Sequence, residues 1–153
     1  MKWFCVIILF VFTACAQPKY FNVVAPNGSS NESYKLEADC SVRFELFSQC
    51  FSWRLIEPLE AQKNLTIIVK FYRPNLYDQT LVYEDIAANR EFKAKLWMTS
   101  MGHGSVPVQI KRLDVGTYEI SHVNFIMSGS WQIYFDQIEN DQIDRITVNI
   151  NVP

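Results

Sequence analysis

The chain has 153 residues, which is enough for one domain of ordinary size and too few for two. Hydrophobic residues make up 49% of it and aromatic residues 14%, so the composition excludes a disordered protein and predicts a substantial core. The formal net charge is −2 and no basic run occurs, which argues against nucleic acid as a partner.

The amino-terminal residues have the layout of an export signal. Lys2 precedes an apolar run from Trp3 to Phe12, and small residues follow it. The run is too short to cross a bilayer stably. We therefore expect residues 1–15 to be a signal peptide and the mature protein to be exported to the periplasm of a bacterial cell.

Two cleavage chemistries fit the end of this signal. The residues FTAC resemble a lipobox, in which Cys15 would carry a lipid and become the first mature residue. Ala14-Cys15-Ala16 also fits the small-x-small rule of an ordinary signal peptidase. A cysteine directly after Thr-Ala favours the first alternative, because the second gives the cysteine no role. The favoured interpretation is a lipoprotein held at the membrane by a lipid anchor on Cys15.

The next segment, residues 16–38, is polar and contains APNGSSNES without a sustained apolar period. Such a composition is typical of a flexible linker. A linker of this kind would lift a folded domain, expected over residues 39–153, off the lipid surface.

Cys40 and Cys50 are expected to form a disulfide, because disulfides persist outside the cytoplasm. The bond would close a short loop and stabilise the fold by roughly 2–3 kcal/mol in the chain-entropy model. A hairpin that turned at Ser48-Gln49 would conflict with it, since Cys40 would then face residue 57. The sequence leaves open whether the bridge or that hairpin is misread.

From Cys40 onward the hydrophobic period is two, which is typical of β-strands. No stretch shows a convincing amphipathic helical period. The expected strands occupy residues 41–47, 51–57, 65–71, 80–84, 91–98, 107–113, 117–126, 131–138 and 143–152.

Turn-forming residues separate these runs. Seven to nine short strands at this spacing predict an all-β fold, namely an immunoglobulin-like antiparallel β-sandwich. A small closed barrel is the alternative. The expected turns lie at Pro58, Pro74-Asn75, Gly102 with Gly104, Val115-Gly116, Ser128-Gly129 and Asn140-Asp141.

Soft donor atoms concentrate in WMTSMGHGSVP, residues 97–107. A thioether prefers Cu(I), and imidazole accepts either oxidation state of copper. Met98, Met101 and His103 therefore predict a copper site, provided that the strand ends between the two methionines, because residues three apart on a strand point to opposite faces. Gly102 permits a positive φ, which would let a tight loop turn the His103 ring toward the sulfurs.

Met127 could supply a third sulfur, because it ends a strand and the strand ends of a sandwich cluster at its two poles. The competing interpretation is that Met98 and Met127 fill gaps in the core and that His103 is a solvated loop residue. Trp97 and Trp131 flank the methionines and either shield a metal ion or pack the core.

Other candidate residues are weaker. His122 shares the strand parity of Tyr118 and Ile120, so a half-buried strand position is expected for it rather than a ligand role. An acidic stretch near the last turn is expected to be a solvated face, because calcium would need more oxygen ligands in a tighter loop. It comprises Asp136, Glu139, Asp141 and Asp144.

Three separated motifs resemble the YtkA-like domain, which is found also in the periplasmic part of FixH-type proteins. The family pattern runs Met-x-x-Met-x-His-Gly-Ser-x-Pro, then Gly-x-Tyr, then Phe-x-Met-x-Gly-x-Trp. The resemblance covers about residues 50–138 well. The matching residues are Met98, Met101, His103, Gly104, Ser105, Pro107, Gly116, Tyr118, Phe125, Met127, Gly129 and Trp131.

The resemblance implies an immunoglobulin-like sandwich outside the cytoplasm, often near copper-handling or heme–copper oxidase assembly systems. Carried over residue by residue, it names Met98, Met101, His103 and Met127 as the metal ligands. FixH-type proteins keep a transmembrane segment where this chain is expected to carry a lipid. That departure counts against an oxidase-assembly partner in particular.

Enzyme signatures such as Gly-x-Ser-x-Gly and His-Glu-x-x-His are missing from the sequence, so no catalysis is expected. The leading hypothesis is a copper-handling protein of the cell envelope that buffers Cu(I) or delivers it to a protein partner. The alternative hypothesis is a structural or protein-interaction module of the envelope that binds no metal.

Overall fold

The computed structural model describes residues 20–22, 42–78 and 80–153. The expected signal peptide, Cys15 and Cys40 lie outside these ranges. No helix of the described part has the length and apolarity needed to cross a membrane. The strands in chain order are β1 (Tyr20–Asn22), β2 (Val42–Phe44), β3 (Gln49–Leu55), β4 (Asn64–Pro74), β5 (Leu81–Tyr83), β6 (Glu91–Met98), β7 (His103–Gly104), β8 (Gln109–Asp114), β9 (Thr117–Asn124), β10 (Gly129–Glu139) and β11 (Gln142–Val152).

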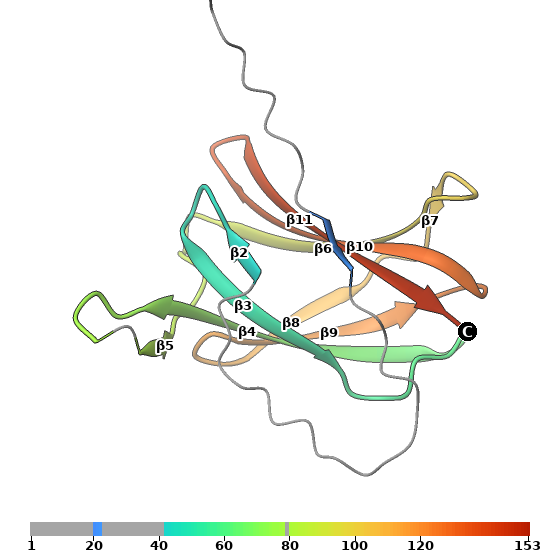
Figure 1. Ribbon diagram of the computed structural model, residues 1–153, viewed down its shortest axis with the longest axis horizontal. Coiled ribbons are helices and arrows are strands. Elements are labelled where there is room, and N and C mark those ends of the chain that lie inside the picture. Colours follow the sequence, from blue (N-terminus) through green and yellow to red (C-terminus); the bar gives the residue numbers. More distant parts are fainter. Residues whose placement is uncertain (1–19, 23–41, 79) are drawn as a thin grey trace, which may run out of the picture.

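Two sheets pack face to face (Figure 1). The first has the strand order β1-β11-β10-β6-β7, and the second has the order β2-β3-β4-β9-β8, with β5 paired to the end of β4. All neighbours are antiparallel except β1 and β11. The fold is an immunoglobulin-like antiparallel β-sandwich, as the sequence predicted. Within the described ranges the strand order of each sheet ends at an edge strand and does not return to its first strand, so the fold is not a closed barrel.

The core lies between the sheets and follows from the alternating pattern. In β4, Leu65, Ile67, Val69 and Phe71 are all buried, while the residues between them are more exposed. Aromatic rings from both sheets pack edge to face: the centroids of Phe51 and Phe135 lie 5.1 Å apart, with an angle of 67° between the ring planes. Edge-to-face pairs of this kind add to the stabilisation from burial.

The turn between β10 and β11 is formed by two of the predicted turn residues. Asn140 and Asp141 have φ values of 48° and 64°, and Glu139 faces Gln142 across them. Two positive φ angles make a two-residue turn whose twist matches that of the flanking strands, and Asn and Asp tolerate this conformation. The expected turn at Asn140-Asp141 is confirmed.

The hairpin of β2 and β3 differs from the one considered from the sequence. Its turn covers residues 45–48, so that Gln49 already lies in β3 opposite Phe44. In this register Arg43 faces Cys50. Cys50 is buried and disulfide-bonded. Its partner lies outside the described residues, so the bond to Cys40 stays a prediction.

One short strand lies inside the range expected as a linker. Residues 20–22 pair in parallel with Thr147, Val148 and Asn149 of β11. An edge strand offers unpaired backbone groups, and β1 uses those of β11. The structure describes no other residue of the expected linker.

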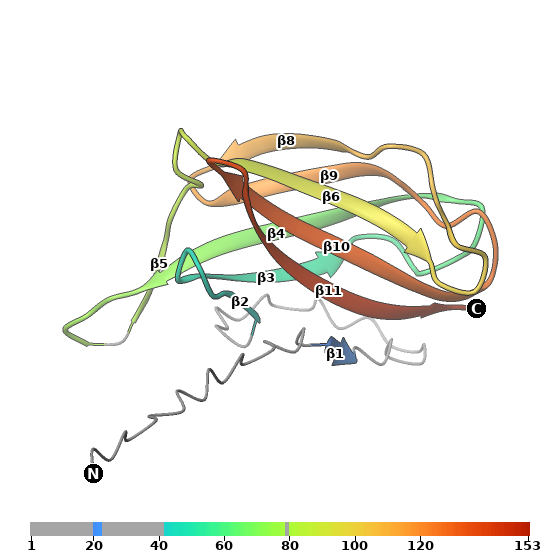
Figure 2. The same cartoon turned by 90° about the horizontal axis from the view of Figure 1, so that it is seen from above.

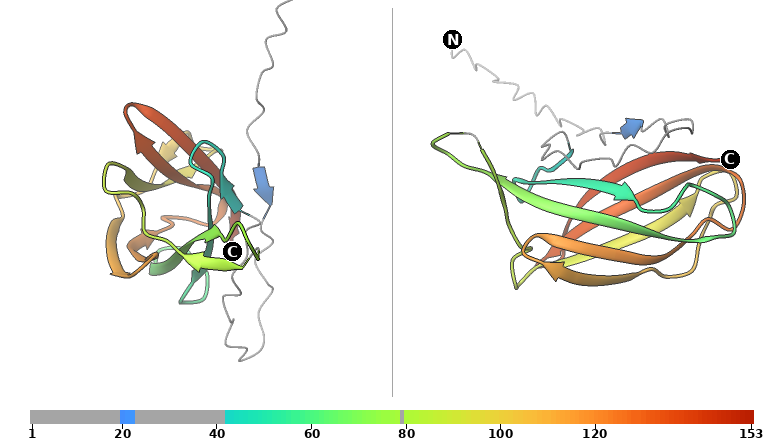
Figure 3. Two further views of the ribbon diagram at one scale, coloured as in Figure 1. Left: turned by 90° about the vertical axis from the view of Figure 1, so that its left-hand side faces the viewer. Right: turned by 90° about the horizontal axis from the view of Figure 1, so that it is seen from below.

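The molecule is elongated, and its two ends differ. The β4–β5 hairpin projects at one end, whereas the β6–β7 loop, the β9–β10 turn and the carboxyl terminus gather at the other (Figures 1 and 2). Figure 3 shows the same separation from below. We call the second end the methionine pole and define it as residues 98–105 and 124–131.

Candidate metal centre

The β6–β7 hairpin places a thioether beside an imidazole. β6 ends at Met98 and β7 begins at His103, so the strand does end between the two methionines. Gly102, with a φ of 66°, donates its N–H to the Met98 carbonyl at 3.0 Å and closes the loop. Met98 and His103 are direct cross-strand partners. Side chains of such partners share one face of the sheet, with Cβ atoms about 4.5–5.5 Å apart.

The β9–β10 turn packs against the same hairpin. Trp131 lies opposite Met98 on its other side, and the Trp131 indole donates to the Met127 carbonyl at 3.0 Å. A Cβ atom on Gly129 would lie 3.0 Å from the terminal methyl of Met98. The two methionine segments, which are far apart in the sequence, therefore meet at one pole.

The four expected ligands differ in exposure. Met98 is 5% exposed and belongs to the core, whereas Met101 and Met127 are 59% and 38% exposed. His103 is half-buried. The core-filler interpretation thus fits Met98 but not Met127, and His103 is not fully solvated.

The His103 ring has one nitrogen available. Its Nδ1 lies 3.2 Å from the Gly104 carbonyl, which accepts a hydrogen bond if Nδ1 carries the proton. Nε2 then keeps a free lone pair, which is the usual arrangement of a histidine that binds a metal.

The donors at the pole suit a soft metal ion. Within the described part of the chain, no group of three or more His, Cys, Asp or Glu side chains could hold a metal. The donors at the pole are instead thioethers and one imidazole, which are neutral and favour Cu(I). Met101 and Met127 are 59% and 38% exposed, so both thioethers can be reached from the solvent.

The Gly-x-Tyr motif has a structural role. Gly116 has a φ of 61° and donates its N–H to Asp85 Oδ1 at 2.8 Å. Arg112 donates to both oxygens of the same carboxylate at 3.0 and 2.6 Å, and the Tyr118 hydroxyl donates to it at 3.4 Å. The hydrogen bonds from Arg112 and then Gly116 hold the pKa of Asp85 at about 2. The motif therefore fixes the loop after β5.

Two further motif residues, Phe125 and Ser105, make contacts that stabilise the fold. The Phe125 ring lies 5.5 Å from the Trp131 ring in a T-shaped arrangement. The Ser105 hydroxyl donates to the Asn124 carbonyl and ties the β7–β8 connection to the end of β9. The motif side chains Met101, His103 and Met127 do not belong to the buried core.

The two tryptophans that flank the methionines face different environments. Trp97 precedes Met98 in β6 and so points to the outer face of the sheet, where the Lys95 ammonium lies 4.7 Å from its ring centroid. A shielding role is therefore wrong for Trp97. Trp131 is buried against the core side of the pole.

His122 is exposed, so the expected half-buried position is wrong. The pairing of β4 with β9 shifts register between Leu65 and Ile67, which leaves an extra residue in β9. His122 takes a φ of 58° in this bulge, and both Ile120 and Val123 are buried as a result. The inserted residue turns His122 outward.

The expectation of a solvated acidic face is wrong for two of its residues. Asp136 and Asp144 are only 7% and 8% exposed. Asp136 accepts two hydrogen bonds of 2.7 Å from Arg145, and Asp144 accepts one of 2.7 Å from the Leu46 N–H. Burial raises the pKa of Asp144. Both carboxylates hold strands and loops together.

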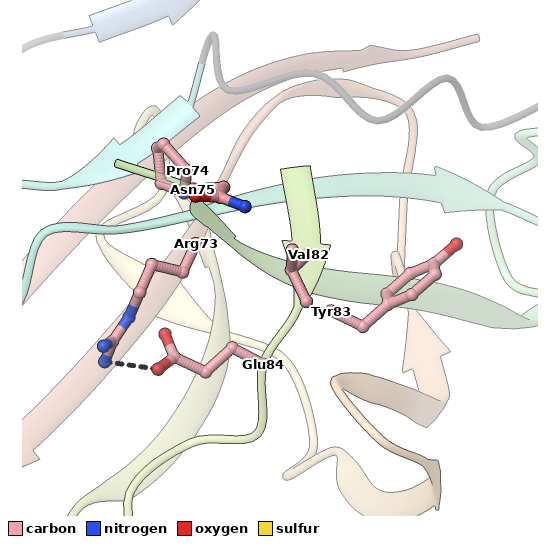
Figure 4. A pocket seen from close by; sticks show the side chains of 6 residues that line it. All are labelled: Arg73, Pro74, Asn75, Val82, Tyr83 and Glu84. Carbon is pink, nitrogen blue, oxygen red and sulfur yellow. Dashed lines mark ion pairs between the residues drawn. The ribbon is translucent and has the colours of Figure 1, made fainter. Parts of the chain in front are cut away.

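A hollow of about 200 Å³ lies at the base of the β4–β5 hairpin, at the opposite end from the methionine pole (Figure 1). An ion pair between Arg73 and Glu84 spans one side of it (Figure 4). Neither sulfur nor imidazole lines it. Its lining residues are Arg73, Pro74, Asn75, Val82, Tyr83 and Glu84.

No family model and no curated protein matches the chain. Among solved structures, the filamin domain of Lin-41 is similar to it, with 10% sequence identity and a TM-score of 0.37. That likeness covers 63% of this chain and 90% of the filamin domain. At this level it carries no argument about function, and the YtkA-like resemblance stays a prediction.

Proposed function

We propose that the methionine pole binds one Cu(I) ion through Met98, Met101, His103 and Met127, and that the protein buffers or delivers copper in the cell envelope. The observation that carries this proposal is the cross-strand pair of Met98 and His103, which Trp131 joins to the Met127 segment. Three elements thereby bring soft donors to one end of the sandwich.

The different exposures of the ligands suit transfer of the ion. Met98 would close the inner side of the site, because its side chain lies within the core. Met101 and Met127 stand on the solvent side, where an incoming ligand from a partner can replace them. All four donors are neutral, so the site keeps the preference of thioethers for Cu(I) over the harder divalent ions.

An anaerobic Cu(I) competition titration against a chromophoric chelator tests this proposal. The double variant Met101→Leu/Met127→Leu keeps size and apolarity at two exposed positions, so it leaves the fold intact. We expect it to weaken Cu(I) binding by about tenfold or more, because two of four soft ligands are lost.

The exposed His122 supplies a matched control. His122→Asn removes an imidazole outside the site, and Asn tolerates the positive φ at that position. The control should bind Cu(I) as the unaltered chain does. Equal affinity of the control and the double methionine variant would remove the metal hypothesis.

The proposal also concerns the location of the protein. It assigns Cys15 as a lipid-carrying first residue of an exported chain, which would hold the copper site close to the membrane. Mass spectrometry of the mature protein tests this part separately. A diacylated Cys15 supports it, and an unmodified amino terminus at Gln17 contradicts it.

An interaction module is the second candidate function, and the β4–β5 connection favours it. Leu76 and Tyr77 are 88% and 98% exposed there. Apolar side chains at the tip of a projecting hairpin are typical of contact surfaces. On this alternative, capture of a partner would persist in copper-free buffer and would be lost in Leu76→Ser/Tyr77→Ser, while the methionine substitutions would leave it unchanged.

A further inference from the structure

β6 is paired along only one side over most of its length. β10 pairs with it from Glu91 to Met98, whereas β7 pairs only with Trp97 and Met98 on the other side. Within the described ranges, no strand lies against the first part of that second side. The described part of the sheet therefore has an open edge at β6.

The direction of the backbone groups at this edge follows from one hydrogen bond. The Leu96 carbonyl accepts the Ser105 N–H at 3.3 Å on the β7 side. Both backbone groups of a residue in an antiparallel strand point to the same side, and this side alternates along the strand. The N–H and C=O groups of Phe92 and Ala94 therefore point to the open edge as well.

An apolar groove of about 450 Å³ runs along this edge, between β6 and the connection that leads into β8. Ala94 and Leu96 contribute from β6, and Val106, Val108 and Ile110 contribute from the other wall. β8 is itself the last strand of the second sheet. The groove thus lies where both sheets of the sandwich end.

The charged side chains beside the groove leave one lysine, Lys95, without a described carboxylate partner, which favours an acidic ligand. Lys93 and Lys95 stand on the outer face of β6, and the Lys93 ammonium lies 2.9 Å from the Glu91 carboxylate. The acidic residue that lines the groove, Asp136, is already paired with Arg145. Lys95 has no carboxylate partner among the described ion pairs.

A second copy of the chain is a poor occupant of this edge. Antiparallel pairing of two β6 edges centred on Ala94 would place Lys93 of each copy opposite Lys95 of the other. Like charges directly opposite each other destabilise a sheet. Lysines on an edge strand are indeed a common means of preventing self-association.

We propose that the open edge of β6 and its groove bind an extended segment of a partner protein, which adds to the sheet as a further strand. The segment would alternate small apolar residues, which enter the groove, with acidic residues, which lie opposite Lys93 and Lys95. Its backbone would pair with Phe92 and Ala94. Strand addition of this kind takes affinity from the backbone and specificity from alternate side chains. The inference is independent of copper binding.

Fluorescence anisotropy with two capped, labelled peptides tests the proposal on the purified chain. One peptide alternates Glu and Val, and the matched peptide alternates Lys and Val. We expect the acidic peptide to bind and the basic peptide not to bind. Lys93→Glu/Lys95→Glu should weaken binding of the acidic peptide by about tenfold or more, because the variant places two negative charges where the acidic side chains of the peptide would lie. Lys63→Glu/Lys70→Glu makes the same charge change elsewhere and should stay within about twofold of the unaltered chain.

A second measurement locates the peptide. Amide hydrogen exchange at Phe92 and Ala94 should slow when the acidic peptide is bound. Ala94→Pro removes an N–H that faces the open edge rather than β10, so it should abolish binding while β6 stays paired with β10. If that variant does not fold, the charge-reversal pair still decides the matter.

Three results would overturn the proposal. The first is equal binding of the acidic and basic peptides, and the second is unchanged amide exchange at Phe92 and Ala94 in the bound state. The third is no binding of the acidic peptide by the unaltered chain.

Discussion

Gly116 illustrates how a motif residue can be required by backbone geometry alone. Its φ is 61°, and a Cβ atom there would lie 2.8 Å from the Phe71 carbonyl and 3.0 Å from the backbone of Glu84. The Phe71 carbonyl belongs to the paired strand β4 and cannot move aside easily. We predict that Gly116→Ala destabilises the fold by roughly 2–3 kcal/mol in chemical denaturation.

Gly102 provides the control for this prediction. It has a φ of 66°, but a Cβ atom on it would meet nothing within 4 Å. Gly102→Ala therefore carries only the conformational cost of a positive φ, about 1 kcal/mol. Equal losses in the two variants would show that crowding at Gly116 contributes nothing.

Asp85 links the loop after β5 to the acid stability of the protein. Its pKa is lowered to about 2 by Arg112 and the Gly116 N–H, and the ordinary value is about 3.9. A carboxyl group whose pKa is lower in the folded state than in the unfolded state stabilises the fold at a pH above its ordinary pKa. This contribution is lost as the pH falls from about 4 to about 2. Denaturation curves measured between about pH 4 and about pH 2 should show that the free energy of unfolding falls less in Asp85→Asn than in the unaltered chain. Asp141→Asn, at an exposed turn, should leave this fall unchanged; the same smaller fall in both variants would contradict the assignment.

At the scale of elements, a pair of buried amides connects the two sheets. Gln137 of β10 donates from Nε2 to Gln49 Oε1 of β3 at 2.7 Å, and both side chains are almost fully buried. Arg90 donates to Gln137 Oε1 at 3.1 Å, and Gln49 Nε2 donates to the Glu84 carbonyl at 3.3 Å. Every member of this network has a partner, so it fixes how β3 and β10 align.

Breaking this network should be costly. Gln137→Leu would leave the Gln49 carbonyl oxygen buried without its partner, and we predict a loss of about 1–3 kcal/mol in urea denaturation. Gln49→Leu/Gln137→Leu should lose less than the sum of the two single variants, because neither amide is then left behind. Strictly additive losses would show that the two side chains do not act as a pair.

Most strands could be predicted from the sequence because one face of each is buried. The period of two gives β4, β6, β9, β10 and β11 nearly in full, and Asn140-Asp141 marks the last hairpin. β7 could not be predicted, because a strand of two residues shows no hydrophobic period. The bulge that turns His122 outward could not be predicted either. The extra residue changes how β9 pairs with β4, but the hydrophobic alternation of the sequence does not show it.

The sequence could predict that the candidate ligands lie near one end of the sandwich but not how deeply each of them is buried. The donor types and the glycines around His103 indicate a soft-metal loop from the sequence alone. That Met98 lies within the core, and that the Trp131 indole binds the Met127 carbonyl, depends on the register of β10 against β6. The register between two strands that are far apart in the sequence cannot be predicted from the sequence of either strand.

On the scale of the whole molecule, the candidate surfaces are spread over distinct regions. The methionine pole lies at one end and the β4–β5 hairpin at the other (Figure 2). The groove is lined by residues of β6 and of the connection into β8. A sandwich suits this division, because its paired strands hold the ends rigidly while loops and edges carry the binding groups. Metal and protein ligands can therefore be tested one at a time.

The central claim is that three sulfurs and one imidazole at the methionine pole bind a single ion. Methyl NMR of the chain labelled with carbon-13 at the methionine methyl groups, titrated with Cu(I) under anaerobic conditions, tests it most directly. The account predicts that the methyl signals of Met98, Met101 and Met127 shift together and stop shifting at one equivalent. Signals of Met101 and Met127 that stay in place throughout the titration would contradict it.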